Sequence, residues 1–248
     1  MSASETAMAL RQAFEKCRAM DGSLKDRLTS YAAMSAKVLP AYGSAVDRLV
    51  ARIHDNGGGG SAPKAGETMP PFLLPDDGNN LVGLDAVRAH GPVAVVFHRG
   101  HWCPYCRISI GTLVKAQPKI EALGARMVAI VPDRQQFAAD MREDCNVNFP
   151  ILCDMDNGYA MSLNLAIWVG AEMQEYMSRI GRKLPQYQGN ESWMLPIPAT
   201  FVIASDGTVA ARFIDPDYRR RMEIKDLVSA IQAISESPIP ASRANAAE

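Results

Sequence analysis

Two cysteines separated by two residues are the part of this sequence best suited to chemistry. They are Cys103 and Cys106, within the hexapeptide HWCPYC. A continuous apolar run at residues 93–97 precedes them and helical spacing follows, so we expect the pair at a strand-to-helix junction. Positions i and i+3 of a first helical turn lie on one side, about 5–6 Å apart at Cβ, so a small shift closes a disulfide. The pattern predicts a redox site that alternates between two thiols and a disulfide.

Cys103 is the expected nucleophile of the pair. A helix N-terminus favours an anion, which lowers the pKa of a cysteine placed there and yields a thiolate. Pro104 supports this placement because proline fits the first helical turn, where its missing N–H is not needed. The alternative is half of a zinc site, since His98 and His101 lie just upstream. The sequence has no second CxxC and no HxxxH, so we expect neither a metal nor another cofactor.

Residues 1–55 are predicted to form an N-terminal extension of helices, each with one apolar face. Residues 56–66 include four consecutive glycines and are predicted to be a flexible linker. The apolar faces would make a patch larger than the few hundred Å² that a monomer leaves in water. Either the rest of the chain covers this patch or, slightly favoured, a second copy covers it in a twofold homodimer.

Strands and helices alternate after the linker, over residues 67–236. The predicted strands and the closing helix are residues 93–97, 127–131, 149–153, 200–204, 209–214 and 224–234. Asp133 is interpreted as the cap of the helix after the second of these strands. Parallel strands joined by helices and followed by a hairpin give an α/β sandwich. Residues 237–248 are expected to be a loose tail.

The length and charge of the chain disfavour several classes of partner. Its 248 residues carry a formal net charge of -1, which does not favour nucleic acid or an anionic membrane surface. No apolar run approaches the ~20 residues of a membrane span, and the first residues lack the pattern of a signal peptide. We therefore expect a cytoplasmic protein in which Cys17, Cys145 and Cys153 are free thiols.

Four sequence blocks, taken in order, resemble the peroxiredoxin-like (AhpC/TSA-type) branch of the thioredoxin superfamily. They are MPPFLLPD at 69–76, RGHWCPYC at 99–106, LPIPATFVI at 195–203 and FIDPDY at 213–218. The resemblance implies a thioredoxin-like fold, in which helices flank a central mixed sheet, with the helical extension outside it. In thioredoxin-like proteins a cis-proline faces the CxxC, and Pro198 matches that position.

The resemblance is incomplete at the positions that bind peroxide. Peroxiredoxins proper place a threonine three residues before the reactive cysteine and an arginine on the facing strand, where they stabilise the peroxide oxygens. Gly100 and Pro198 occupy those positions here, and Arg99 or Arg107 could replace the arginine. The tetrad CPYC also resembles that of dithiol glutaredoxins, which are much shorter proteins.

The leading hypothesis is a thiol peroxidase in which Cys103 becomes a sulfenic acid that Cys106 resolves to a disulfide. An external thiol reductant, such as a thioredoxin or glutaredoxin system, would restore the dithiol. Arg99, Trp102 and Pro198 are the expected substrate-binding residues. The alternatives are a thioredoxin-type protein disulfide oxidoreductase that uses the same dithiol, and a non-catalytic redox sensor or scaffold.

Two further segments lie near the predicted core. Residues 165–195 form an insertion that is expected to cover the dithiol and to restrict what reaches it. Residues 215–221 end in three consecutive arginines, which we interpret as a solvated loop rather than as part of the active-site rim.

Overall fold

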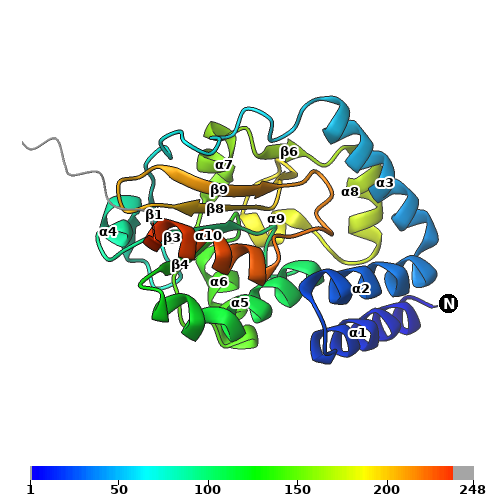
Figure 1. Cartoon of the computed structure of the whole chain (residues 1–248). Helices are drawn as coiled ribbons and strands as arrows, with labels where there is room; N and C mark the ends of the chain where they lie inside the picture. Colours follow the sequence, from blue (N-terminus) through cyan, green and yellow to red (C-terminus); the bar gives the residue numbers. More distant parts are fainter. Residues whose placement is uncertain (1, 237–248) are drawn as a thin grey trace, which may run out of the picture.

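The computed structural model describes residues 2–236 (Figure 1). The predicted tail at residues 237–248 lies outside the described residues. Between residues 2 and 236, no helix has both the length and the apolar character that crossing a membrane requires. In chain order the elements are α1 (Ala3–Ala19), α2 (Leu24–Val38), α3 (Pro40–Asp55), β1 (Leu73–Pro75), β2 (Leu81–Gly83), α4 (Leu84–Arg88), β3 (Val93–Phe97), α5 (Pro104–Ala122), β4 (Arg126–Val131), α6 (Gln135–Cys145), β5 (Ile151–Cys153), η1 (Met155–Asn157), α7 (Gly158–Ser162), β6 (Ala166–Trp168), α8 (Ala171–Arg179), α9 (Leu184–Gln188), β7 (Met194–Pro196), β8 (Ala199–Ile203), β9 (Val209–Ile214) and α10 (Ile224–Glu236).

A five-stranded mixed sheet in the order β5-β4-β3-β8-β9 forms the centre of the fold. β3, β4 and β5 run parallel, while β8 pairs antiparallel with β3 and with β9. Every residue of β3 is buried, which accounts for its continuous apolar sequence. α5 and α10 pack against each other and against the sheet. The predicted architecture is therefore confirmed, including the hairpin of β8 and β9 and the helical extension.

The N-terminal helices pack on the rest of the same chain. α1 and α2 lie beside α5, and α3 lies beside α8 (Figure 1). Their buried apolar residues are Ala13, Phe14, Cys17, Leu24, Leu28, Tyr31, Ala45, Val46, Leu49 and Ile53. The core of the same chain thus covers the apolar faces of these helices. The apolar patch was the argument for a homodimer, and it no longer supports one. A homodimer stays a prediction without that support.

A buried arginine joins the extension to the core. Arg27 of α2 is 4% exposed. Its guanidinium donates to the carbonyl oxygens of Cys17 at 3.1 Å and Arg18 at 2.6 Å, and to Oγ1 of Thr112 on α5 at 2.5 Å. The two carbonyls belong to the last turn of α1, where the helix itself supplies no donors. One side chain therefore links α1, α2 and α5.

The glycine run after α3, which is predicted to be a flexible linker, makes backbone hydrogen bonds to α3 and to the core. The N–H of Gly58 donates to the Ile53 carbonyl at 2.9 Å, and the N–H of Gly59 donates to the Asn164 carbonyl at 3.1 Å. A Cβ on Gly58 would lie 2.4 Å from Ile53, and one on Gly59 would lie 2.6 Å from Ile214. Glycine here permits close approach of the backbone to the core. The division into a separate extension and a core domain stays a prediction.

Substitution of Leu28 tests the docking of the extension. Leu28 is 1% exposed, and Leu28→Ala removes methyl groups from a packed interior. We expect the free energy of unfolding in urea to fall by about 2–5 kcal/mol. Lys37→Ala, at an exposed position of the same helix, is the control and should change it by less than about 0.5 kcal/mol. Equal unfolding free energies for the two variants would contradict the docking.

Candidate active site

The two cysteines lie where the chain passes from β3 into α5, as the sequence predicts. Cys103 is the N-cap of α5, Pro104 is its first residue and Cys106 lies in its first turn. Both cysteines are free thiols. Cys103 is 1% exposed and Cys106 is 0% exposed. A large molecule therefore has no direct access to either sulfur.

The Cys103 thiol ionises well below neutral pH. Burial alone raises the pKa of this thiol, but a hydrogen bond from Cys106 and the positive charges of Arg99 and Arg221 outweigh burial and lower the pKa to about 5. A thiolate is the reactive form of cysteine. Cys103 therefore has the surroundings of a nucleophile, and they depend on two buried arginines that the helix N-terminus argument did not include.

Cys106 is held in the opposite protonation state. Burial raises the pKa of the Cys106 thiol, and its hydrogen bond with Cys103 and the charge of Cys103 raise it further, to well above its usual value. The Cys106 sulfur accepts from the backbone N–H of Arg99 at 3.3 Å and from Nη2 of Arg221 at 3.8 Å. The site thus combines one thiolate with one thiol that can donate to it.

Aromatic rings from three parts of the chain frame the dithiol. Tyr105, between the two cysteines, packs edge-on against Tyr31 of α2 and against Tyr218, with ring centroids 5.0 Å and 5.3 Å apart. The Arg99 guanidinium lies 3.7 Å from the centre of the Tyr218 ring and 5.1 Å from that of Trp102. These rings hold a buried guanidinium beside the sulfurs. Through Tyr31, the extension is part of the frame.

Arg99, and not Arg107, is the arginine next to the sulfurs. Nη2 of Arg107 lies 2.8 Å from a carboxylate oxygen of Asp144, and its guanidinium lies 4.7 Å from the ring centre of Phe14 on α1. Arg99 is 3% exposed and its charge acts on Cys103. Of the two candidates for the missing peroxiredoxin arginine, the structure therefore favours Arg99.

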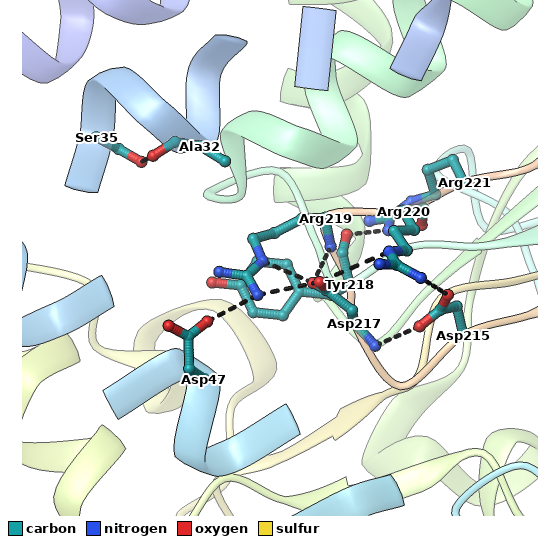
Figure 2. Close-up of polar contacts among 9 residues, drawn as sticks. All are labelled: Ala32, Ser35, Asp47, Asp215, Asp217, Tyr218, Arg219, Arg220 and Arg221. Carbon is teal, nitrogen blue, oxygen red and sulfur yellow. Dashed lines mark hydrogen bonds and ion pairs between the residues drawn. The ribbon is translucent and has the colours of Figure 1, made fainter. Parts of the chain in front are cut away.

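The loop after β9 is anchored by ion pairs (Figure 2). Arg219 lies 2.7 Å from Asp217 in the loop and 2.8 Å from Asp47 on α3, so it ties the loop to the extension. Arg220 lies next to it in the sequence, and its side chain is 71% exposed. The solvated-loop interpretation therefore holds for Arg220.

The same interpretation is wrong for Tyr218 and Arg221, which are 5% and 8% exposed. The Arg221 guanidinium donates to the carbonyls of Tyr218 and Arg220 and extends to the Cys106 sulfur. The turn that these bonds close directs the third arginine of the run inward. The composition of the arginine run predicts that all three side chains lie in solvent, because composition cannot show which of them faces the core.

Asp133 lies beneath the loop that leads to the dithiol, two residues after β4. It is 0% exposed; Oδ2 accepts the N–H of His101 at 2.7 Å, while Oδ1 has no hydrogen-bond partner among the described residues. Burial raises the pKa of the Asp133 carboxyl to about 7; the His101 N–H opposes this rise and the charge of Cys103 adds to it. Near neutral pH this carboxyl can both donate and accept a proton.

Gly100 is the residue that fits beside this carboxyl. Its φ is +127°, and a Cβ would lie 2.5 Å and 2.6 Å from the two Asp133 oxygens. The threonine that peroxiredoxins proper carry at this position therefore does not fit here. Asp133 is not a helix cap, because Arg134 is the N-cap of α6. Its position outside the carboxyl end of a parallel strand, where α/β sheets bind ligands, is the signal that could have identified it.

The two histidines near the dithiol lie in different surroundings. His98 is 0% exposed, neither ring nitrogen has a hydrogen-bond partner in the described chain, and burial and the Arg221 charge lower its pKa to about 3. Nε2 of His101 lies 2.8 Å from Asp144 instead. Among the described residues, no group of three or more histidine, cysteine, aspartate and glutamate side chains could hold a metal ion.

Pro198 lies near Arg99 but is not a cis-proline. It occupies the connection between β7 and β8 and lines a small cavity with Arg99, Leu49 and Tyr218. No peptide bond in the described residues is cis, so the prediction of a cis bond at Pro198 is wrong. The trans form of an X–Pro bond is lower in energy by about 0.5–1 kcal/mol.

The segment 165–195 packs against the redox motif. The ring of Tyr187 on α9 lies 6.4 Å from the Trp102 ring, and its carbonyl accepts the N–H of Arg134 at 2.8 Å. The Arg182 guanidinium lies 6.0 Å from the ring centre of Tyr42, and its charge interacts with Tyr31 and Cys103. The segment therefore adds a cation to the surroundings of the dithiol as well as covering it.

Comparisons with known proteins place this chain in a family. Residues 65–212, more than half of the chain, match the model of the AhpC/TSA family, and α1–α3 lie outside the match. Comparison with curated protein sequences gives no match. Among solved structures, the peroxidoxin BcpB from Mycobacterium tuberculosis is similar, with 20% identity, 69% of this chain and 98% of that chain covered, and a TM-score of 0.54.

Two further peroxiredoxins have the same fold. A cysteine-to-serine mutant of peroxiredoxin 6 from Arenicola marina has 15% identity, covers 69% of this chain and 73% of its own, and has a TM-score of 0.53. Peroxiredoxin Q from Xanthomonas campestris has 14% identity, covers 66% of this chain and 92% of its own, and has a TM-score of 0.50. The peroxiredoxin-like, thioredoxin-like fold that the four sequence blocks imply is thus confirmed.

The ionisation of Cys103 tests the electrostatics of the site. The ultraviolet absorbance of the thiolate, taken as the difference from Cys103→Ser, should titrate with a midpoint near pH 5. Arg221→Gln should raise this midpoint, because it removes a positive charge that stabilises the thiolate. Arg220→Gln removes the same charge from the exposed neighbour and should leave the midpoint unchanged. An unaltered midpoint in Arg221→Gln would contradict its place beside the dithiol.

Proposed function

Because the chain belongs to the AhpC/TSA family, we propose that it is a thiol peroxidase that reduces hydrogen peroxide or organic hydroperoxides at Cys103. The observation that carries the choice of substrate is the burial of both sulfurs, at 1% and 0% exposure. A small peroxide needs only a narrow path to such a sulfur. A protein disulfide would have to be brought into contact with it through the covering residues.

The proposed reaction has two covalent steps. The Cys103 thiolate attacks one oxygen of the peroxide, the O–O bond breaks, and Cys103 becomes a sulfenic acid while the other oxygen leaves with the electron pair and takes up a proton. The Cys106 thiol then loses its proton, attacks the Cys103 sulfur and expels hydroxide, which becomes water. The dithiol gives up two electrons and becomes a disulfide.

We assign the proton transfers to Asp133. Its protonated carboxyl donates to the departing oxygen of the peroxide, and the carboxylate that results accepts the proton of Cys106 and returns it to the leaving hydroxide. The assignment is supported by the unpartnered Oδ1 atom, the pKa of about 7 and the electrostatic interaction with Cys103.

The three expected substrate-binding residues have different parts in this proposal. Arg99 supplies positive charge where the O–O bond breaks, which is the role of the arginine in peroxiredoxins proper. Pro198 lines a small cavity with Arg99. Trp102 lines a separate cleft on the outer side of the dithiol. All three assignments stay predictions.

An external thiol restores the dithiol after each cycle, and we place the reaction in the cytoplasm, where thiols are kept reduced. A thioredoxin-type disulfide oxidoreductase that uses the same dithiol stays the alternative. Neither it nor the alternative of a redox sensor or scaffold has an observation that favours it over the peroxidase.

Cysteine variants separate the two steps. Cys103→Ser should abolish peroxide consumption, whereas Cys106→Ser should react once and stop as a sulfenic acid, seen by mass spectrometry as the gain of one oxygen atom. Cys17→Ser removes a buried thiol in α1 and is the matched control, which should turn over normally. Turnover by Cys103→Ser, or an unmodified Cys106→Ser after peroxide treatment, would contradict the proposed roles.

The pH dependence of the peroxide reaction tests Asp133. The rate should rise through about pH 5 as Cys103 ionises and fall through about pH 7 as Asp133 loses the proton that it donates. Asp133→Asn should remove the fall and slow the reaction by on the order of a hundredfold. Asp140→Asn, at an exposed position of α6, should keep the wild-type profile. A fall near pH 7 that persists in Asp133→Asn would overturn the assignment.

A further inference from the structure

A cleft of about 490 Å³ opens on the outer side of the dithiol. Its walls come from α1, α2, the start of α5, the end of α6 and the turn after α8. They include Arg11, Tyr31, Trp102, Pro104, Arg107 and Arg182. The extension and the segment 165–195 therefore both build it. The volume lies within the range of about 300–1,000 Å³ that is usual for small-molecule sites.

The cleft borders the redox motif at the residues on either side of Cys103. Trp102 and Pro104 are part of its lining, while Cys103 itself is 1% exposed behind them. A second cavity, of about 260 Å³, is lined by Arg126 and Pro150, at the opposite end of the parallel strands. It therefore has no access to the dithiol.

The charges of the cleft are incompletely paired. Arg107 is matched with Asp144. Arg11 and Arg182 line the cleft from α1 and from the turn after α8, and no carboxylate pairs with either among the described residues. Glu15 is a lining acid that has no cation partner in the same part of the chain. The Arg182 guanidinium also lies 6.0 Å from the ring centre of Tyr42. Two guanidiniums and one carboxylate of the cleft are thus without an ion-pair partner among the described residues.

We propose that this cleft binds the electron donor of the enzyme, and that the donor is a small peptide thiol with two carboxylates and one ammonium group. Guanidinium groups bind carboxylates through charge-assisted hydrogen bonds, and Glu15 suits the ammonium. The burial of both sulfurs favours a donor small enough to enter over a protein donor. This inference rests on the proposed peroxidase cycle, for which it supplies the reducing step.

The reducing step is a pair of thiol–disulfide exchanges. The thiolate of a first donor attacks the Cys103 sulfur, the Cys103–Cys106 bond breaks, and Cys106 leaves and takes up a proton. A second donor thiolate then attacks the donor sulfur of this mixed disulfide. Cys103 leaves as a thiolate, and the low pKa of its thiol makes it a good leaving group. Two donor thiols thus provide two electrons and are released as one disulfide.

Glutathione, which has this arrangement of charges, is the probe. The Cys103–Cys106 disulfide is formed with a chemical oxidant, so that the test does not depend on peroxide activity, and its reduction is followed by tryptophan fluorescence in stopped flow. We expect glutathione to react at least about tenfold faster, at equal thiolate concentration, than neutral 2-mercaptoethanol or cationic cysteamine. We also expect glutathione to be a better donor than thioredoxin.

Arg11→Gln tests the cleft directly. It should weaken apparent glutathione binding about tenfold and leave unchanged both the rate with 2-mercaptoethanol and the peroxide reaction of the reduced protein. Lys37→Gln removes one positive charge from an exposed position of α2, outside the cleft, and is the matched control.

The donor proposal would be overturned if glutathione and neutral thiols reduced the disulfide at equal rates, or if thioredoxin reduced it faster than glutathione. Unchanged glutathione binding in Arg11→Gln would also overturn it. A reduced wild-type protein that does not react with peroxide would instead overturn the peroxidase. The two failures are therefore distinguishable.

Discussion

A buried thiolate is the constraint on which the rest of this structure depends. Cys103 is almost fully enclosed, and burial opposes its charge, so the charge must be balanced from within the protein. Arg99, Arg221 and the Cys106 thiol provide that balance. Each of them is itself buried, and the Tyr218 and Trp102 rings hold Arg99 in place. The loop after β9 is therefore as much a part of the redox site as the CxxC itself.

The same constraint explains why the extension belongs to the fold. Tyr31 packs on the tyrosine between the two cysteines, and Asp47 pairs with Arg219 of the loop that carries Arg221. Removal of the helices would thus expose the redox motif and release one anchor of that loop. The segment 165–195 closes the other side. Together they separate the sulfurs from large molecules and leave a cleft beside them.

The sequence predicted the features that depend on local pattern. The continuous apolar run of β3, the placement of Cys103 and Pro104 at the start of α5, and the helices of the extension are all set by spacing along the chain. The family resemblance added the order of the elements, which spacing alone does not determine. For the glycine run, composition reports the freedom of the backbone and not the surface that the backbone meets.

The features that were missed depend on contacts between distant residues. Asp133 fits a helix-cap pattern, and only the register of β4 beside β3 brings it beneath the loop at Gly100. Arg221 cannot be distinguished from its two neighbours until the loop folds and turns one of the three inward. Family position alone implied a cis bond at Pro198, and the structure has a trans bond there.

The most direct test of the central claim is the reaction of the reduced protein with one equivalent of hydrogen peroxide, with thiols and disulfide counted afterwards by mass spectrometry. The account predicts loss of both Cys103 and Cys106 thiols, formation of one disulfide between them and full consumption of the peroxide, while Cys17, Cys145 and Cys153 stay reduced. Unconsumed peroxide and an intact dithiol, in protein that readily reduces an insulin-type disulfide, would contradict it.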